Sequence, residues 1–253
     1  MNGLFDSLTH PRLAPGGERS FAAVEASLRQ NGFSRACAVA MPDDPDYDDG
    51  RWLQACANHP VFVAVAPLLL SDDLPLRMAE VARQGFAAVK IHPRLLGPGF
   101  SPQWLVAALQ AAADHNVPVM LCTYFAHRFG VAGCLDFEGL VACLRQVPAT
   151  NVVLLHGGTT RLLELSEIVR HNPNLLLDIS FTLCKYPGSS LDNDLKFLAQ
   201  LFDRRICVGS DWPDFDHAQT RARYDWLVAG LAPEQADNIG FGNLARFLRL
   251  EAA

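Results

Sequence analysis

Short apolar runs alternate along the chain with longer segments whose apolar residues recur at helical spacing. The short runs are almost continuously apolar, as expected for strands of a parallel sheet buried on both faces. Strands followed by helices predict a series of βα units. We expect eight strands, at Leu4–Asp6, Ala36–Met41, Phe62–Ala66, Ala88–His92, Val119–Thr123, Val152–His156, Leu175–Ile179 and Ile206–Gly209.

The segments between these runs have the pattern of amphipathic helices. Asn31-Gly32 and Gly85 follow two of them and are typical helix ends, and Ser101-Pro102 precedes a third as a typical start. The acidic stretch Asp43–Asp49 is expected to be a solvated loop. The predicted helices are Ser20–Gln30, Leu74–Gln84, Trp104–His115, Phe137–Val147, Thr160–His171, Asp192–Phe202, Thr220–Leu231 and Asn243–Leu250.

Repeated βα units build either an open doubly wound sheet or a closed barrel. A dinucleotide-binding sheet would carry a G-x-G-x-x-G motif after its first strand, and no such motif follows Leu4–Asp6. The length of 253 residues suits one eight-stranded barrel, and no low-complexity linker divides the chain. We therefore predict an α/β fold, a (β/α)8 TIM barrel that forms a single domain over residues 1–253.

Charge and composition narrow the classes of partner. The formal net charge of −6 argues against a sequence-independent grip on nucleic acid or on anionic lipid. The first residues lack the pattern of a secretory leader, and the apolar runs are too short for a membrane span, so a cytoplasmic location is expected. The seven cysteines form no C-x-x-C pair, which favours reduced cysteines packed in the core.

Polar side chains follow the expected strands at their carboxyl ends, where a barrel places its functional residues. Any one of them could be a satisfied structural residue, but together they predict a polar site at the barrel mouth. The residues concerned are Asp6 and His10, Lys90 and His92, Cys122 and Thr123, His156, Asp178 and Ser180, and Asp211.

Two of these residues are candidates for acid–base catalysis. Asp211 follows the turn at Gly209-Ser210, which would direct its carboxylate into the mouth as a general base or proton relay. His156 precedes Gly157-Gly158, which let the backbone approach a ligand closely. The alternative for both is structural, as a brace of the last turn and as a core histidine.

A further group is expected to contact the substrate: Lys90, His92, Thr123 and Trp212. Lys90 interrupts an apolar strand, so it should meet a carboxylate of Asp6, Asp178 or Asp211, or one on the substrate. His92 precedes a proline and could instead shape the turn. His127 and Arg128 could reach over the mouth towards an anion or simply form an exposed loop pair.

Four strings of the sequence, AVKIHP, NVVLLHGG, ICVGSDWP and NIGFGNLARFLRL, resemble the amidohydrolase-2 family of metal-dependent hydrolases and decarboxylases. The resemblance covers nearly the whole chain in order and spacing. It implies a divalent metal, commonly zinc, held by an H-x-H pair on the first strand, a histidine on the fifth and an aspartate on the eighth. The histidine of the sixth strand would polarise the substrate or bind a second metal.

The sequence departs from this pattern at two ligand positions. Leu8 stands where the family has the first histidine of the H-x-H pair, and leucine cannot bind a metal. Cys122 stands where the fifth-strand histidine would be, and a thiolate can serve as a ligand. The remaining metal candidates are His10, Cys122, His156 and Asp211, a depleted set that makes ordinary zinc dependence the less favoured reading. Related barrels often pair, which leaves a homodimer open.

Three functions remain open from the sequence. The first is a hydrolase of a small carbonyl compound such as a lactone, amide or ester, with or without a metal. The second is a catalytically silent barrel that binds a ligand or a protein partner. The third is a decarboxylase of a small aromatic or enol acid, against which the missing ligands weigh because such reactions normally use a metal as the electron sink.

Overall fold

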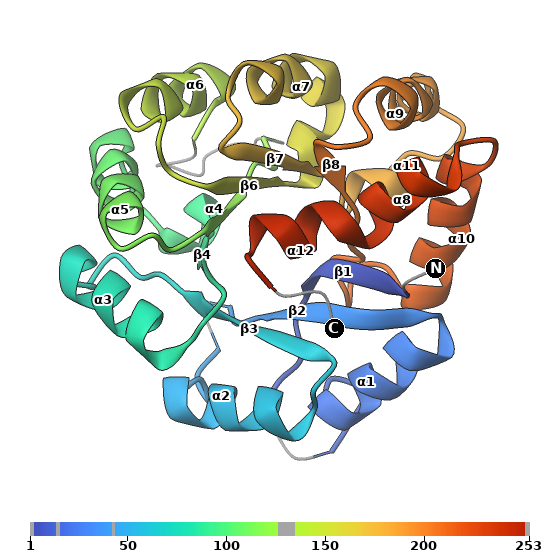
Figure 1. Cartoon of the computed structure of the whole chain (residues 1–253). Helices are drawn as coiled ribbons and strands as arrows, with labels where there is room; N and C mark the ends of the chain where they lie inside the picture. Colours follow the sequence, from blue (N-terminus) through green and yellow to red (C-terminus); the bar gives the residue numbers. More distant parts are fainter. Residues whose placement is uncertain (1–2, 14–15, 42–43, 126–134, 251–253) are drawn as a thin grey trace.

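Eight parallel strands form one sheet in the order β1 to β8, and Figure 1 shows them as a ring surrounded by helices. The computed structural model describes residues 3–13, 16–41, 44–125 and 135–250. Backbone bonds from Ser7 N to Val208 O (3.0 Å) and from Asp211 N to Leu8 O (2.9 Å) join the last strand to the first. The strands are β1 (Leu4–Thr9), β2 (Phe33–Val39), β3 (Phe62–Pro67), β4 (Ala88–Ile91), β5 (Val119–Cys122), β6 (Val152–Leu155), β7 (Leu175–Asp178) and β8 (Ile206–Cys207). The (β/α)8 prediction is therefore confirmed.

The expected strands are all present. β2 begins at Phe33, three residues before the predicted start, and the other main differences lie where the chain turns at the mouth. β1 continues to Thr9, three residues beyond the predicted end, because its pairing with β2 resumes after an irregularity. β6 and β8 end earlier than predicted. His156 and Asp211 follow these strands with φ of 67° and 55°, values that an extended ladder cannot accommodate.

Helices cover the outside of the ring. One of them, α2, begins at Asp49, where the sequence predicted a loop over residues 43–49. The Asp48 side chain accepts from Arg51 N, so part of the acidic stretch caps a helix. The helices are α1 (Phe21–Gln30), α2 (Asp49–Asn58), α3 (Leu74–Gln84), α4 (Pro93–Leu96), α5 (Pro102–Asp114), α6 (Phe137–Gln146), α7 (Leu162–His171), α8 (Thr182–Lys185), α9 (Ser190–Leu201), α10 (His217–Val228), α11 (Pro233–Asp237) and α12 (Asn243–Phe247), with a 3-10 turn η1 (His156–Arg161) and a π turn η2 (Asn238–Gly242).

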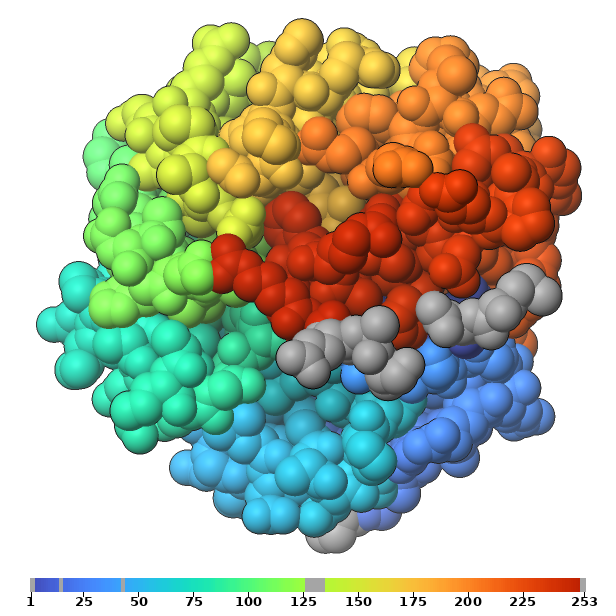
Figure 2. Space-filling view, viewed as in Figure 1, coloured from blue at the N-terminus to red at the C-terminus, as the bar shows by residue number. Residues whose placement is uncertain are grey.

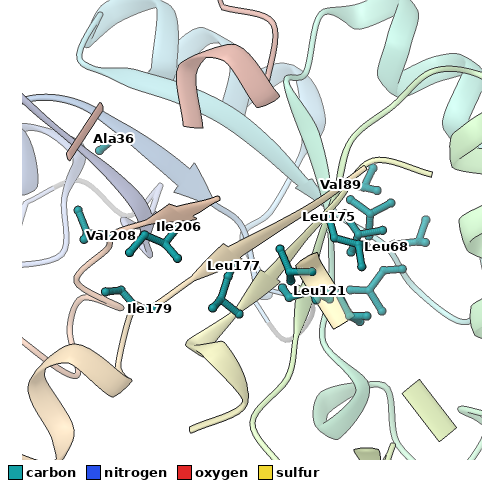
Figure 3. Close-up of a cluster of buried hydrophobic side chains, with 14 of the residues drawn as sticks. Ala36, Leu68, Val89, Leu121, Leu175, Leu177, Ile179, Ile206 and Val208 are labelled. Atoms are coloured by element: carbon teal, nitrogen blue, oxygen red, sulfur yellow. The ribbon is translucent and has the colours of Figure 1, made fainter. Parts of the chain in front are cut away.

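The strands separate two apolar layers. Ala88, Met120, Val153 and Leu176 alternate with their neighbours and fill the inside of the barrel. The residues between them point outward and pack beneath the helices; Val89, Leu121 and Leu177 are among those labelled in Figure 3. By the same alternation, Lys90, Cys122 and Asp178 belong to the inner face, two residues above the apolar floor.

The end of the chain packs against one end of the barrel, where Figures 1 and 2 show it lying across the ring. Phe241, Leu244, Ala245 and Leu248 join the same apolar cluster as the side chains inside the barrel. This end is therefore filled by hydrophobic side chains, and the polar residues lie at the other end of the strands. In the described ranges, the longest helix has 13 residues and none is long and apolar enough to cross a membrane.

Leu109 on α5 provides a test of the outer layer. It is fully buried, and we expect Leu109→Ala to lower the free energy of unfolding by about 2–5 kcal/mol through lost packing and a residual cavity. Leu76→Ala on α3 is the matched control, because Leu76 is 58% exposed and should change stability little. Urea denaturation of the two variants compares them. Equal losses would contradict the observed burial.

Candidate active site

Asp211 lies between two histidines at the mouth of the barrel. His10, directly after β1, places Nε2 3.5 Å from Asp211 Oδ1. His156, directly after β6, places Nδ1 3.7 Å from Asp211 Oδ2. All three side chains are largely buried, so the carboxylate interacts with the two imidazoles at a low local dielectric. Three strand ends that are distant in the sequence thus supply one acid–base cluster.

The orientation of the His10 ring is fixed by a hydrogen bond of the nitrogen that does not face Asp211. Its Nδ1 lies 2.8 Å from the carbonyl oxygen of Val39 on β2. A carbonyl oxygen can only accept, so Nδ1 carries the hydrogen and Nε2 is the nitrogen directed at Asp211. The first strand therefore presents one defined nitrogen to the carboxylate.

His156 and Asp211 both have left-handed backbone conformations, which are uncommon for residues with a side chain. The buried carboxylate of Asp178 stabilises the first, because Oδ1 accepts from His156 N and from Ser180 N, each at 3.1 Å. Asp6 stabilises the turn that leads into Asp211, because its Oδ1 accepts from Ser210 N at 2.8 Å and its Oδ2 from Ser210 Oγ at 2.6 Å. Asp6 and Asp178 thus hold the backbone of the site.

Cys122 ends β5, and its thiol interacts electrostatically with the imidazole of His156. Burial alone would raise the pKa of the Cys122 thiol, but the adjacent His156, Lys90 and Arg94 lower it to about 6. Burial would lower the pKa of His156, whereas Cys122 and Asp211 raise it above its usual value. The Cys122 thiol is therefore mostly a thiolate at neutral pH, and His156 holds its proton more tightly than a free imidazole does.

The charge of Asp211 is fixed by the same neighbours. Burial would raise the pKa of the carboxyl, but the charge of His156 and the hydrogen bond with His10 hold it well below its usual range. Asp214, three residues later, has a raised pKa because it is partly buried and faces the charge of Asp211. Asp211 is thus the carboxylate that stays ionised over the whole neutral and mildly acidic range.

Lys90 does not form the carboxylate pair that the sequence predicted. In the described part of the chain, no hydrogen bond or ion pair within 4.0 Å joins its ammonium group to Asp6, Asp178 or Asp211, although the side chain is only 1% exposed. Burial lowers the pKa of Lys90, and the charges of Cys122, Asp211 and Asp178 oppose that effect. Of the two partners that the sequence left open for Lys90, the structural aspartate is therefore not the one found, since Asp6 and Asp178 accept from backbone and serine donors, and a substrate carboxylate stays a prediction.

His92 directly precedes α4 and is also buried. Burial, with the charges of Lys90 and Arg94, holds the pKa of His92 well below its usual value. Its Nδ1 has no hydrogen-bond partner among the described residues. His92 is therefore a neutral imidazole beside two cations.

A pocket of about 200 Å³ opens over this cluster. Four of its lining residues were missed by the sequence reasoning: Arg94, Tyr124, Phe181 and Asp214. The signals were present, because each follows a predicted strand-end residue within a few positions. Their contribution depends on loop conformation, which no short-range pattern fixes. The pocket is lined by Arg94, Tyr124, His156, Phe181, Asp211 and Asp214.

Two predicted substrate contacts are occupied elsewhere. Thr123 Oγ1 donates to Leu155 O at 2.5 Å and accepts from Gly158 N at 3.0 Å, so it ties β5 to the turn after β6. Trp212 stacks on His217 with ring centroids 6.1 Å apart. Like Lys90 and His92, neither residue is among those that line the pocket. The predicted loop contacts His127 and Arg128 lie outside the described residues.

The side chains present do not fit the metal site of the family. Leu8 is fully buried among the apolar residues inside the barrel and supplies no ligand. The thiol of Cys122 lies 3.9 Å from Arg94 Nη2, a cation beside which a metal ion would be repelled. In the described ranges, no three histidine, cysteine, aspartate or glutamate side chains are arranged to hold a metal ion. The predicted set of His10, Cys122, His156 and Asp211 is thus a cluster of acid–base groups in this structure.

The ionisation of Cys122 is directly measurable. The pH dependence of iodoacetamide alkylation, mapped to Cys122 by peptide mass spectrometry, should have its midpoint near pH 6 because the thiolate is the reacting form. His156→Gln removes the largest lowering contribution and should move the midpoint upward. Cys143, whose pKa burial raises, is the internal control. Equal midpoints for both cysteines would contradict the ion pair.

Comparison with known proteins places this geometry in context. An amidohydrolase family model (Amidohydro_2) matches residues 17–250, whereas no protein of curated function matches the chain. An uncharacterised TIM-barrel protein from Bordetella bronchiseptica is similar in structure, with a TM-score of 0.79 and 18% identity over 97% of this chain and 98% of that one.

Two solved structures with named activities are also similar. A putative 2-pyrone-4,6-dicarboxylic acid hydrolase from Pseudomonas putida has a TM-score of 0.67 and 18% identity, with all of both chains covered. A 2,6-dihydroxybenzoate decarboxylase from Rhizobium has a TM-score of 0.67 and 16% identity, again with all of both chains covered. At these identities the structures support the fold, and the family model decides membership. The chain belongs to the amidohydrolase family.

Proposed function

We propose that the protein is a hydrolase of a small carbonyl compound, a lactone, amide or ester, with Asp211 and His156 as its acid–base pair. The observation that supports this most is the position of the Asp211 carboxylate, 3.5 Å from His10 and 3.7 Å from His156 on the wall of a pocket. Family membership supplies the reaction class in its broad form.

The pair can divide the proton transfers of hydrolysis. Asp211 is ionised and can accept a proton from a water as that water attacks the carbonyl carbon. His156, with its raised pKa, can donate a proton to the oxygen or nitrogen that leaves. His10 holds Asp211 in place through a nitrogen whose orientation is fixed by the Val39 carbonyl. The side chains of the protein therefore supply both the proton acceptor and the proton donor of the reaction.

The cations of the site indicate an anionic substrate. Arg94 lines the pocket and stacks on Tyr124, with its guanidinium carbon 4.6 Å from the ring centroid. Its Nε has no hydrogen-bond partner among the described residues, and Lys90 nearby is likewise unpaired. Buried cations favour an opposite charge, so a carboxylate on the substrate would complete the site. The dicarboxylic acid named for the Pseudomonas putida hydrolase has this chemistry.

The two other functions have less support. A silent barrel would not need the left-handed backbone at His156 and Asp211, because such strain persists where function requires it. A decarboxylase has a structural relative in the Rhizobium protein, but the residues here do not fit the metal that such chemistry normally uses. A cytoplasmic location, a homodimer and the lack of nucleic-acid or membrane partners stay predictions.

The function is tested with a panel of small lactones and esters, each supplied with and without a carboxylate group. We expect hydrolysis of a carboxylate-bearing member, and Asp211→Asn should lower kcat by about 10²-fold or more while changing the thermal midpoint little. Asp225→Asn is the matched control and should keep full activity, because Asp225 is an exposed residue of α10 that pairs with Arg221 and is not among the residues that line the pocket. An Asp211→Asn variant with full activity would refute the assigned role, and no turnover of any member would refute the function.

A further inference from the structure

Cys122 has a catalytic setting that hydrolysis by an activated water leaves unused. Its thiol interacts electrostatically with His156, and His156 in turn contacts Asp211 through Nδ1 at 3.7 Å. A thiol, an imidazole and a carboxylate in this sequence of contacts form a nucleophile, its base and the group that orients the base. The three residues come from the ends of three different strands, β5, β6 and β8.

Two cationic side chains near the Cys122 thiol favour the binding of a negatively charged group beside it. Arg94 Nη2 lies 3.9 Å from Cys122 Sγ. The ammonium group of Lys90, 99% buried, has no hydrogen bond or ion pair among the described residues, and Cys122 is its strongest favourable charge partner. An oxyanion on the carbon bonded to the sulfur would form in the field of these two positive charges, which is where such a charge is stabilised.

Two other cysteines on the inner face of the barrel can be compared with Cys122. Cys207, on the inner face of β8, is 3.8 Å from the carboxylate of Asp178, and burial with that negative charge raises its pKa far above the usual value. Cys37 on β2 has a raised pKa for the same reasons. Cys122 has a histidine, a lysine and an arginine in place of carboxylates. Its surroundings thus differ in kind from those of the packing cysteines.

We propose that Cys122 is the nucleophile of the hydrolase and forms a thioester with the acyl part of the substrate. This inference rests on the proposed function and assigns its first chemical step to the protein. His156 is the proton carrier of that step, and Arg94 and Lys90 stabilise the oxyanion.

The two half-reactions balance. The Cys122 thiolate bonds through Sγ to the carbonyl carbon, and the carbonyl electron pair moves to the oxygen, while His156 holds the proton. Collapse of this adduct breaks the bond to the leaving oxygen, which takes the proton from His156. A water then loses a proton to Asp211 and attacks the thioester, the carbon–sulfur bond breaks, and the thiolate is restored with release of a carboxylic acid. Asp211 passes the proton back to His156, which restores the starting state. The net reaction is ester plus water to acid plus alcohol.

The test uses 4-nitrophenyl acetate as a small acyl donor, with acid quenching and peptide mass spectrometry to locate acetyl groups. In the wild-type protein Cys122 should acquire acetyl at least about tenfold faster than Cys143 or Cys207, with a burst of nitrophenolate. In Asp211→Asn, deacylation slows and the adduct should approach one per chain. Cys122→Ala should remove the burst, and the control Cys143→Ser should keep it.

The outcomes separate the nucleophile from the function. Catalytic hydrolysis of a panel lactone with no acetyl on Cys122, in either wild type or Asp211→Asn, would overturn the covalent route and leave a hydrolase that uses water directly. Acetyl on Cys122 without hydrolysis of any lactone would support the nucleophile and refute the proposed function. The wild-type adduct map decides the inference even if Cys122→Ala fails to fold.

Discussion

The buried carboxylates of Asp6 and Asp178 are the constraint on which the site depends. Each lies fully inside the protein, and a buried carboxylate persists only when donors satisfy its oxygens. The donors here are backbone and hydroxyl groups of the segments that carry the reacting side chains: His156 N and Ser180 N for Asp178, and Ser210 N for Asp6. The two carboxylates therefore convert strand ends into defined turns.

The turns place His156 and Asp211 in left-handed conformations, and the charges of the site follow from that placement. Asp211 stays ionised because His156 and His10 face it, and His156 keeps its proton because Asp211 and Cys122 face it. Each charge is stabilised by another in the same cluster. The family resemblance implies histidines around a metal at two positions where this chain has Leu8, inside the barrel, and Cys122, beside His156. The groups that remain are suited to proton transfer.

The sequence predicts the barrel well because each βα unit is a local pattern. All eight strands were found from apolar runs alone, and the position of Asp211 and His156 after strands placed them at the mouth. The site is predicted less completely. Lys90 was expected to pair with an aspartate, but Asp6 and Asp178 are saturated by backbone and serine donors, and those bonds span up to 204 residues of sequence.

The missed pocket residues have the same cause. Arg94 follows a proline that begins the one-turn helix α4, and its contacts with Tyr124 and Cys122 come from the next strand of the barrel. Thr123 was predicted to contact substrate because it ends a strand, yet its hydroxyl is used within the wall. Local patterns locate the mouth, whereas the partner of each polar group there depends on neighbouring strands.

The most direct test of a site that works through its own side chains is hydrolysis of a carboxylate-bearing lactone by protein treated with a strong metal chelator and then dialysed. The account predicts that kcat and KM stay unchanged after treatment and after zinc is added back, because Asp211, His156 and Cys122 supply the proton transfers and the nucleophile. Loss of turnover on chelation, with recovery on addition of zinc, would contradict it and would assign the reaction to a bound metal.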